Sequence, residues 1–137
     1  MAAAGSKVVT LGKRDFKAKV FNYAPGREWK FEGDRPAVID FYADWCAPCK
    51  MVSPILDELS VEYDGRVRFY KVNTEKDPEV AKAFGISSIP TLLFAGMEGN
   101  PVVLRGAQSK QALAKQIGMI LPGEKRGLLG RIFSLGK

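Results

Sequence analysis

Residues 37–59 read AVIDFYADWCAPCKMVSPILDEL, and this stretch decides how the chain folds. It opens with a nearly continuous apolar run at 37–43, which is typical of a central strand covered on both faces. Helical spacing of apolar residues then predicts a helix from Pro48 to about Tyr63. The apolar positions of that helix are Met51, Val52, Ile55, Leu56 and Leu59. The stretch is therefore read as a buried strand followed directly by a helix.

On both sides of this stretch, apolar residues again follow either a strand pattern or helical spacing, with turn residues between the segments. The predicted strands lie at 8–11, 37–43, 67–72, 91–95 and 102–105, and the predicted helices at 14–22, 48–63, 77–84 and from Ser109 to Leu121. Residues 96–101 contain two glycines and a proline, which predicts a hairpin and an antiparallel last strand pair. The order βαβαβαββα predicts an α/β domain with a mixed sheet and helices on both faces.

The length of 137 residues and the 46% apolar content favour one globular domain. The net charge of +6 lies at the two ends of the chain. Residues 1–35 hold eight basic against four acidic residues, residues 36–121 nine against ten, and residues 122–137 four against one. The body is thus nearly neutral, and it lacks the basic face that nucleic-acid binding requires.

These patterns predict three parts: a disordered lead-in at 1–6, the domain at 7–121 and a basic tail at 122–137. No run approaches the roughly 20 apolar residues that cross a bilayer. The first residues, MAAAGSKVV, lack the basic flank and apolar run of a secretory signal. We therefore expect a cytoplasmic protein, the alternative being an exported protein whose signal has been removed.

The only two cysteines, Cys46 and Cys49, are three positions apart, and the chain has no histidine. A structural zinc site generally needs four Cys or His ligands, so zinc would require carboxylates or a second subunit. A purely structural disulfide is a second alternative, but it would close too short a loop to constrain the unfolded chain much. Redox chemistry is the third, and the position of the pair favours it.

Cys46 lies where the predicted strand gives way to the helix, so it sits at a helix N-terminus. Unpaired N–H groups and the helix dipole favour an anion there, and only the thiolate attacks a disulfide. Cys49 lies one turn into the helix and is expected to be less exposed than Cys46. The pattern therefore predicts that Cys46 attacks and that Cys49 resolves the mixed disulfide.

Three segments in order resemble the thioredoxin family of the bacterial type: DFYADWCAPCKMVSPILDEL at 40–59, GISSIPTLLF at 85–94 and LRGAQSKQAL at 104–113. The likeness extends from about Lys7 to Leu121. It implies the thioredoxin fold and a thiol–disulfide oxidoreductase that reduces disulfides in partner proteins. It further implies that no cofactor is bound, that a separate reductase supplies electrons, and that the protein is a monomer.

The resemblance also implies roles around the cysteine pair. Asp40 matches a buried aspartate that accepts the proton of Cys49, and an acid in an apolar strand should indeed have a raised pKa. Lys71 matches a lysine near that aspartate, although an exposed strand lysine is the alternative. Pro90 matches a cis-proline that faces the disulfide and, together with Ile89, holds the target backbone.

The substrate groove implied by the resemblance further includes Trp45, Gly106 and the two residues between the cysteines, Ala47 and Pro48. Most thioredoxins have glycine where this chain has Ala47. Histidine at that position is associated with oxidising isomerases, and its absence favours a reductant. Two alternatives stay open: a disulfide oxidase or isomerase of the same fold, and a binding module whose cysteines are incidental.

The tail reads PGEKRGLLGRIFSLGK, with Leu128, Leu129, Ile132 and Phe133 spaced as one face of a short helix. Nearby basic residues would suit an anionic membrane or a partner. Gly127 and Gly130 weaken such a helix. We therefore expect a mostly disordered tail and no membrane contact, and docking of the tail on the domain stays open.

Overall fold

The computed structural model describes residues 5–122. Within them lie nine elements in the predicted order. They are β1 (Val9–Thr10), α1 (Lys13–Lys19), β2 (Ala37–Tyr42), α2 (Ala47–Glu62), β3 (Arg68–Asn73), α3 (Pro78–Ala83), β4 (Thr91–Ala95), β5 (Val102–Arg105) and α4 (Lys110–Ile120). The α/β fold class predicted from periodicity is therefore confirmed.

The five strands form one mixed sheet in the order β1-β3-β2-β4-β5. The central strand β2 runs parallel to β3 and antiparallel to β4, and β4 and β5 form the predicted antiparallel hairpin. Ala37 at the start of β2 pairs with Ala95 at the end of β4. The tip of the hairpin therefore lies at the opposite end of the sheet from the residues that follow β2.

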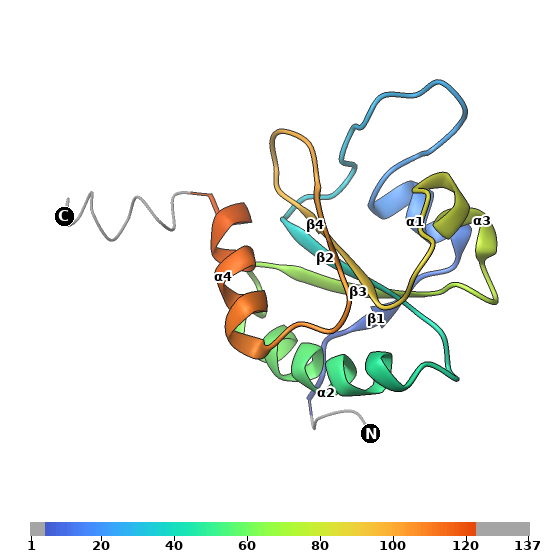
Figure 1. The fold of residues 1–137 in the computed structure, drawn as a ribbon. Helices are drawn as coiled ribbons and strands as arrows, with labels where there is room; N and C mark the ends of the chain where they lie inside the picture. Colours follow the sequence, from blue (N-terminus) through green and yellow to red (C-terminus); the bar gives the residue numbers. More distant parts are fainter. Residues whose placement is uncertain (1–4, 123–137) are drawn as a thin grey trace.

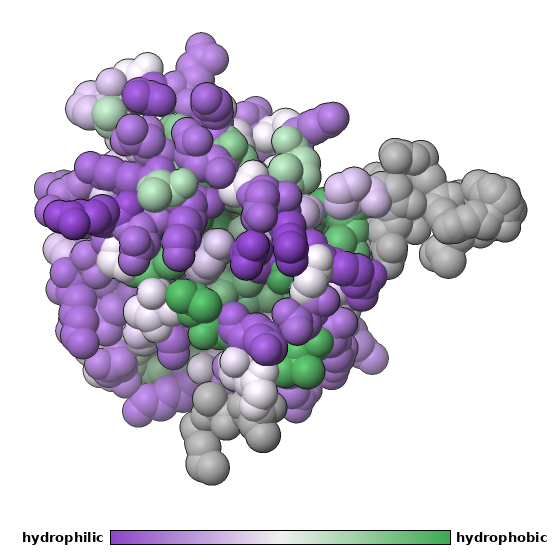
Figure 2. Space-filling model, turned by 180° about the vertical axis from the view of Figure 1, so that it is seen from behind, coloured by the Kyte–Doolittle hydropathy of each residue, from purple (hydrophilic) through white to green (hydrophobic). Residues whose placement is uncertain are grey.

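Helices α1 and α3 lie on one face of the sheet and α2 and α4 on the other (Figure 1), and an apolar core lies between the sheet and each pair of helices. Alternation along β2 sends Ile39 to the core beneath α1 and α3, and Val38 to the core beneath α2 and α4. Asp40 shares the parity of Val38, so it points to the side of the sheet that α2 covers. The outer surface seen from behind is mainly polar, with small hydrophobic patches (Figure 2).

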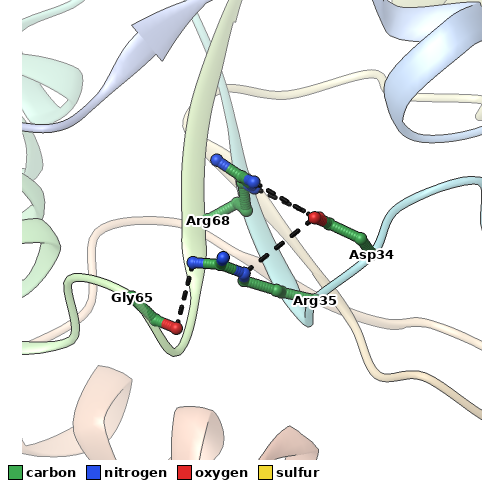
Figure 3. A network of polar contacts seen from close by, with 4 residues as sticks. All are labelled: Asp34, Arg35, Gly65 and Arg68. Carbon is green, nitrogen blue, oxygen red and sulfur yellow. Dashed lines mark hydrogen bonds and ion pairs between the residues drawn. The ribbon is translucent and has the colours of Figure 1, made fainter.

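The long connection between α1 and β2, expected to be a loop, has no regular structure but is packed onto the domain. Trp29 stacks on Phe31 and contacts Phe21 and Phe84 through its ring. At its end, Asp34 accepts hydrogen bonds from Arg68 of β3, and Arg35 donates to the Gly65 carbonyl, 3.0 Å away (Figure 3). Arg68 holds the pKa of Asp34 below its usual value.

Helix α1 is shorter than predicted, since it ends at Lys19 instead of Asn22. Its last predicted turn is replaced by a bend in which Val20 and Phe21 turn into the core and the Val20 carbonyl accepts from Glu32 N–H. Asp77 is the N-cap residue of α3, where this helix was predicted to begin, but its carboxylate makes no cap hydrogen bond and accepts from Lys13 N–H instead. Tertiary contacts thus override two local patterns.

Two further local expectations have mixed outcomes. Ser109, where helix α4 was predicted to begin, is the N-cap of this helix, because its hydroxyl accepts from Ala112 N–H at 3.1 Å. Met51 was placed in the apolar stripe of α2, but it is 69% exposed. The buried stripe runs through Val52, Leu56 and Leu59, and Met51 lies just outside it.

The ends of the chain bear on the predicted domain limits. Ser6, assigned to the lead-in, donates a 2.6 Å hydrogen bond to the Asp57 carboxylate, and Lys7 N–H donates to the Ser60 hydroxyl. Residues 1–4 of that lead-in lie outside the described residues, as does the tail from 123 onward. In the described part of the chain, no helix is both long and apolar enough to cross a membrane.

Candidate active site at the start of helix α2

The two cysteines lie at the junction of β2 and α2, where the predicted strand and helix meet. Cys46 is the N-cap of α2, with extended backbone angles, and it is disulfide-bonded to Cys49. The backbone N–H of Cys49 donates to Cys46 Sγ at 3.2 Å. In the dithiol form that N–H and the helix dipole would stabilise negative charge on Cys46. The predicted position at the helix N-terminus is confirmed.

The prediction that Cys49 is less exposed than Cys46 is wrong for the disulfide form. Both residues of the disulfide are 3% exposed. The two cysteines differ in what they face. Cys46 Sγ lies 3.7 Å from the Ile89 carbonyl oxygen, whereas Cys49 lines a cavity that is partly open to the surface, together with Asp40.

Asp40 is a buried acid in the central strand, as predicted. Its side chain is 3% exposed, and its Oδ1 has no hydrogen-bond partner among residues 5–122. Burial raises the pKa of Asp40 to about 7, because water no longer solvates the charged form. Asp40 is therefore not a solvated acid on an exposed strand face.

A cavity of about 170 Å³ joins Asp40 to Cys49. Its polar lining includes Asp44, Lys50, Ser53 and Lys71. Such a cavity is large enough and polar enough for a few water molecules. Asp40 and Cys49 therefore share one pocket that has other polar side chains in its lining.

Lys71 lies directly beside Asp40, since the two residues are paired across β2 and β3. The Lys71 ammonium lowers the pKa of Asp40, but by less than burial raises it. Lys71 is half-buried, and its Nζ lies 5.3 Å from the centre of the Tyr42 ring. The structure thus places Lys71 at the acid and not on a freely exposed strand face.

The segment that faces Cys46 is held by main-chain hydrogen bonds. The Ile89–Pro90 peptide bond is cis, as the resemblance implies. Gly106 N–H donates to the Pro90 carbonyl at 2.8 Å, and Gly106 has a φ of +88°, a conformation that glycine adopts readily. Glycine at 106 therefore lets the chain turn beside Pro90.

Trp45, Ala47 and Pro48 are exposed around the disulfide, and Trp45 is 67% exposed. The Trp45 indole N–H donates to the Glu75 carboxylate. Trp45 also lines a surface pocket of about 200 Å³ beside Cys46, together with Thr74, Ala81, Ile86, Ser87, Ser88 and Ile89. The residues expected to bind substrate thus fall into two groups. Trp45, Ala47 and Pro48 flank the cysteines in the chain, and Ile89, Pro90 and Gly106 belong to the segments that face Cys46 or bond to Pro90.

Sequence reasoning missed Glu75, Thr74 and Ser53. Thr74 and Glu75 directly follow β3, and Thr74 bonds to the Tyr42 carbonyl through both its N–H and its hydroxyl. The signal was present, because residues after neighbouring parallel strands gather at one edge of a sheet. Ser53 had a weaker signal, since it lies one helical turn beyond Cys49.

No group of three or more Cys, His, Asp or Glu side chains that would hold a metal is found within residues 5–122. The site itself holds a cysteine pair at a helix N-terminus, next to a buried acid. Such a pair exchanges disulfides.

Comparisons with known proteins agree with this chemistry. The thioredoxin family model matches residues 7–119, so the chain belongs to the thioredoxin family. A thioredoxin of Borreliella burgdorferi is 48% identical over 104 residues, which cover 76% of this chain and 89% of that protein. Thioredoxin 1 of Nostoc is 42% identical over 87 residues, 63% of this chain and 80% of the relative.

Chloroplast proteins are also similar. The M-type chloroplastic thioredoxin of Pisum sativum is 38% identical over 101 residues, which make up 74% of this chain and 59% of that protein. The crystal structure of chloroplastic thioredoxin z aligns with a TM-score of 0.71 at 21% identity, over 83% of this chain and 94% of the other. That structure supports the thioredoxin fold.

The site and the family together define the activity. The protein is a thiol–disulfide oxidoreductase that acts as a protein-disulfide reductase, and its redox centre is the Cys46–Cys49 pair. Its substrates are proteins that contain disulfides, and a reductase returns it to the dithiol form.

Proposed function

We propose that this protein is a general reductant of protein disulfides in which Cys46 attacks, Cys49 resolves and Asp40 accepts a proton. The observation that carries these roles is the asymmetry of the disulfide. Cys46 Sγ accepts the Cys49 N–H and faces the Ile89 carbonyl, whereas Cys49 faces the cavity that holds Asp40.

In the first step the Cys46 thiolate attacks one sulfur of a target disulfide. A bond forms between Cys46 and that sulfur, the target bond breaks, and its other sulfur leaves as a thiolate. Main-chain groups of Ile89 and Pro90, with Trp45 and Gly106 at the sides, would hold the target. Contacts to backbone carry little sequence information, which favours broad specificity.

In the second step the Cys49 thiol gives its proton to the Asp40 carboxylate, and the new thiolate attacks Cys46 Sγ. The mixed disulfide breaks, the second target sulfur leaves as a thiolate, and the Cys46–Cys49 disulfide forms. Two electrons have then moved from this protein to the target. An acid whose pKa is about 7 suits this transfer, because at neutral pH it is present in both protonation states.

Two variants test the assignment. Cys46→Ser removes the attacking sulfur, so disulfide reduction should be lost. Cys49→Ser leaves attack intact but prevents resolution, so mixed disulfides with targets should accumulate on a non-reducing gel. Substantial turnover by Cys46→Ser, or absence of mixed disulfides with Cys49→Ser, contradicts the roles.

The reduction potential separates a reductant from an isomerase. Thioredoxins lie near about −270 mV and disulfide isomerases near about −180 mV. Since the chain has no histidine and carries alanine and proline between its cysteines, we expect a value near the lower figure. A value near the higher figure would instead assign an oxidase or isomerase.

We also propose that the protein works as a monomer in the cytoplasm. A disulfide reductant is useful where a separate reductase keeps it reduced, and cytosolic thiols are kept reduced. Alkylation of thiols in intact cells, followed by fractionation, should find the protein in the cytoplasm with Cys46 and Cys49 mainly in the dithiol form. An oxidised protein outside the cytoplasm would contradict this placement.

A further inference from the structure

Exposed apolar side chains gather at one groove, at the opposite end of the sheet from the disulfide. In the described part of the chain, eight large apolar side chains are exposed. Three of them, Met97, Val102 and Met119, line a single groove of about 480 Å³. Clustering of this kind on a small domain is typical of a surface that binds another protein segment, a membrane or a ligand.

The groove is formed by the β4–β5 hairpin and the C-terminal half of α4. At Gly96 the hairpin approaches α4 so closely that a Cβ there would lie 3.6 Å from the Cβ of Ile120. Ile120, Leu121 and Pro122 continue the lining to the last described residue. Figure 2 shows hydrophobic surface next to the point at which the described chain ends.

We propose that this groove is the docking site of the chain's own C-terminal segment, residues 123–137. The segment carries Leu128, Leu129, Ile132 and Phe133, which the activity does not use. Their i, i+1, i+4, i+5 spacing places them on one face of a helix. This inference is independent of the redox roles assigned above.

Reach and proximity both favour this occupant. Leu128 is six residues beyond Pro122, and six extended residues span roughly 20 Å. Since Pro122 itself lines the groove, the apolar face of the segment has only to fold back over it. A tether this short gives an effective concentration of about millimolar, which compensates for the weak binding of a short helix with two glycines.

Charge supports the same occupant. Glu98 is the only charged residue among those that line the groove in the described part of the chain. The segment after Pro122 carries four basic residues against one acidic residue. Attraction between Glu98 and this segment is modest, because Glu98 is exposed. This attraction orients the basic residues of the segment toward Glu98, while apolar contact supplies most of the affinity.

Reciprocal variants of the oxidised full chain test the proposal by hydrogen exchange and amide NMR. Phe133→Asp in the segment should shift the amide resonances of 96–102 and 116–122, and leave those of 40–50 unchanged. Met119→Glu in the groove should speed amide exchange at 128–133 by about tenfold, the change expected when a docked fraction near 90% is released. Val61→Glu, an exposed apolar position on α2, is the matched control and should change neither.

Each contrary result overturns the proposal. The segment does not dock there if Phe133→Asp leaves the groove resonances unchanged and Met119→Glu leaves amide exchange at 128–133 unchanged. The same conclusion follows if a chain ending at Pro122 has the same groove resonances as the full chain. Protection at 128–133 that falls on dilution places the segment on a second copy. Protection that appears only with vesicles of anionic phospholipid places it on a membrane.

Discussion

Replacement of the buried acid Asp40 by asparagine should change how the stability of the protein depends on pH. The free energy of unfolding of Asp40→Asn, measured relative to wild type, should increase as the pH rises. Burial raises the pKa of Asp40 from 3.8 to about 7 in the folded protein. Between these values the folded state binds a proton that the unfolded chain releases, so the wild-type free energy of unfolding falls as pH rises. That stability is fully present below pH 3.8 and is lost by about pH 7.

The magnitude follows from the two pKa values. Each pH unit between them changes the free energy of unfolding by about 1.4 kcal/mol, so the ionised Asp40 costs about 4 kcal/mol above pH 7. Between pH 5 and pH 8 the stability difference between Asp40→Asn and wild type should grow by about 3 kcal/mol. The asparagine amide is itself buried, but that effect is the same at every pH and cancels in the comparison.

The assay is urea unfolding of both oxidised proteins at several pH values. The disulfide form is used because its cysteines do not titrate. Asp44→Asn, which removes an exposed carboxylate from the same cavity, is the matched control; an equally large growth of the stability difference with this variant would show that the effect does not come from burial of Asp40. A difference between Asp40→Asn and wild type that is flat from pH 5 to pH 8 would refute desolvation of Asp40.

Three further variants probe the surroundings of the site and its scaffold. Lys71→Gln removes a charge that lowers the pKa of Asp40, so the pH-dependent loss of stability should extend to higher pH. If the pH at which half of that stability is lost stays the same, the charge of Lys71 does not act on Asp40. Gly106→Ala should destabilise by about 1 kcal/mol in thermal unfolding because of its φ of +88°. Gly118→Ala, inside α4 with open space around it, should instead stabilise by about 0.5–1 kcal/mol, and equal effects at the two glycines would contradict this reasoning. Ser109→Ala removes the cap of α4 and should cost about 1 kcal/mol; no loss would mean that the 3.1 Å hydrogen bond contributes nothing.

The sequence by itself determined the order of the elements and the position of the cysteine pair. Apolar periods of 2 and 3.6, with glycine and proline between them, are local properties of the chain, and so is a Cys-x-x-Cys at the start of a helix. The buried character of Asp40 was also readable, since it interrupts an apolar central strand. The resemblance to a family supplied the cis-proline and the lysine at 71.

Only the tertiary structure decided which groups meet at the site. The pairing of Asp40 with Lys71, the approach of the Ile89 carbonyl to Cys46 and the hydrogen bond from Trp45 to Glu75 all join segments 30 or more residues apart. Strand register and helix packing fix such contacts, and both result from the burial of many side chains at once. Local sequence therefore placed the nucleophile, whereas long-range packing placed the acid and the groove around it.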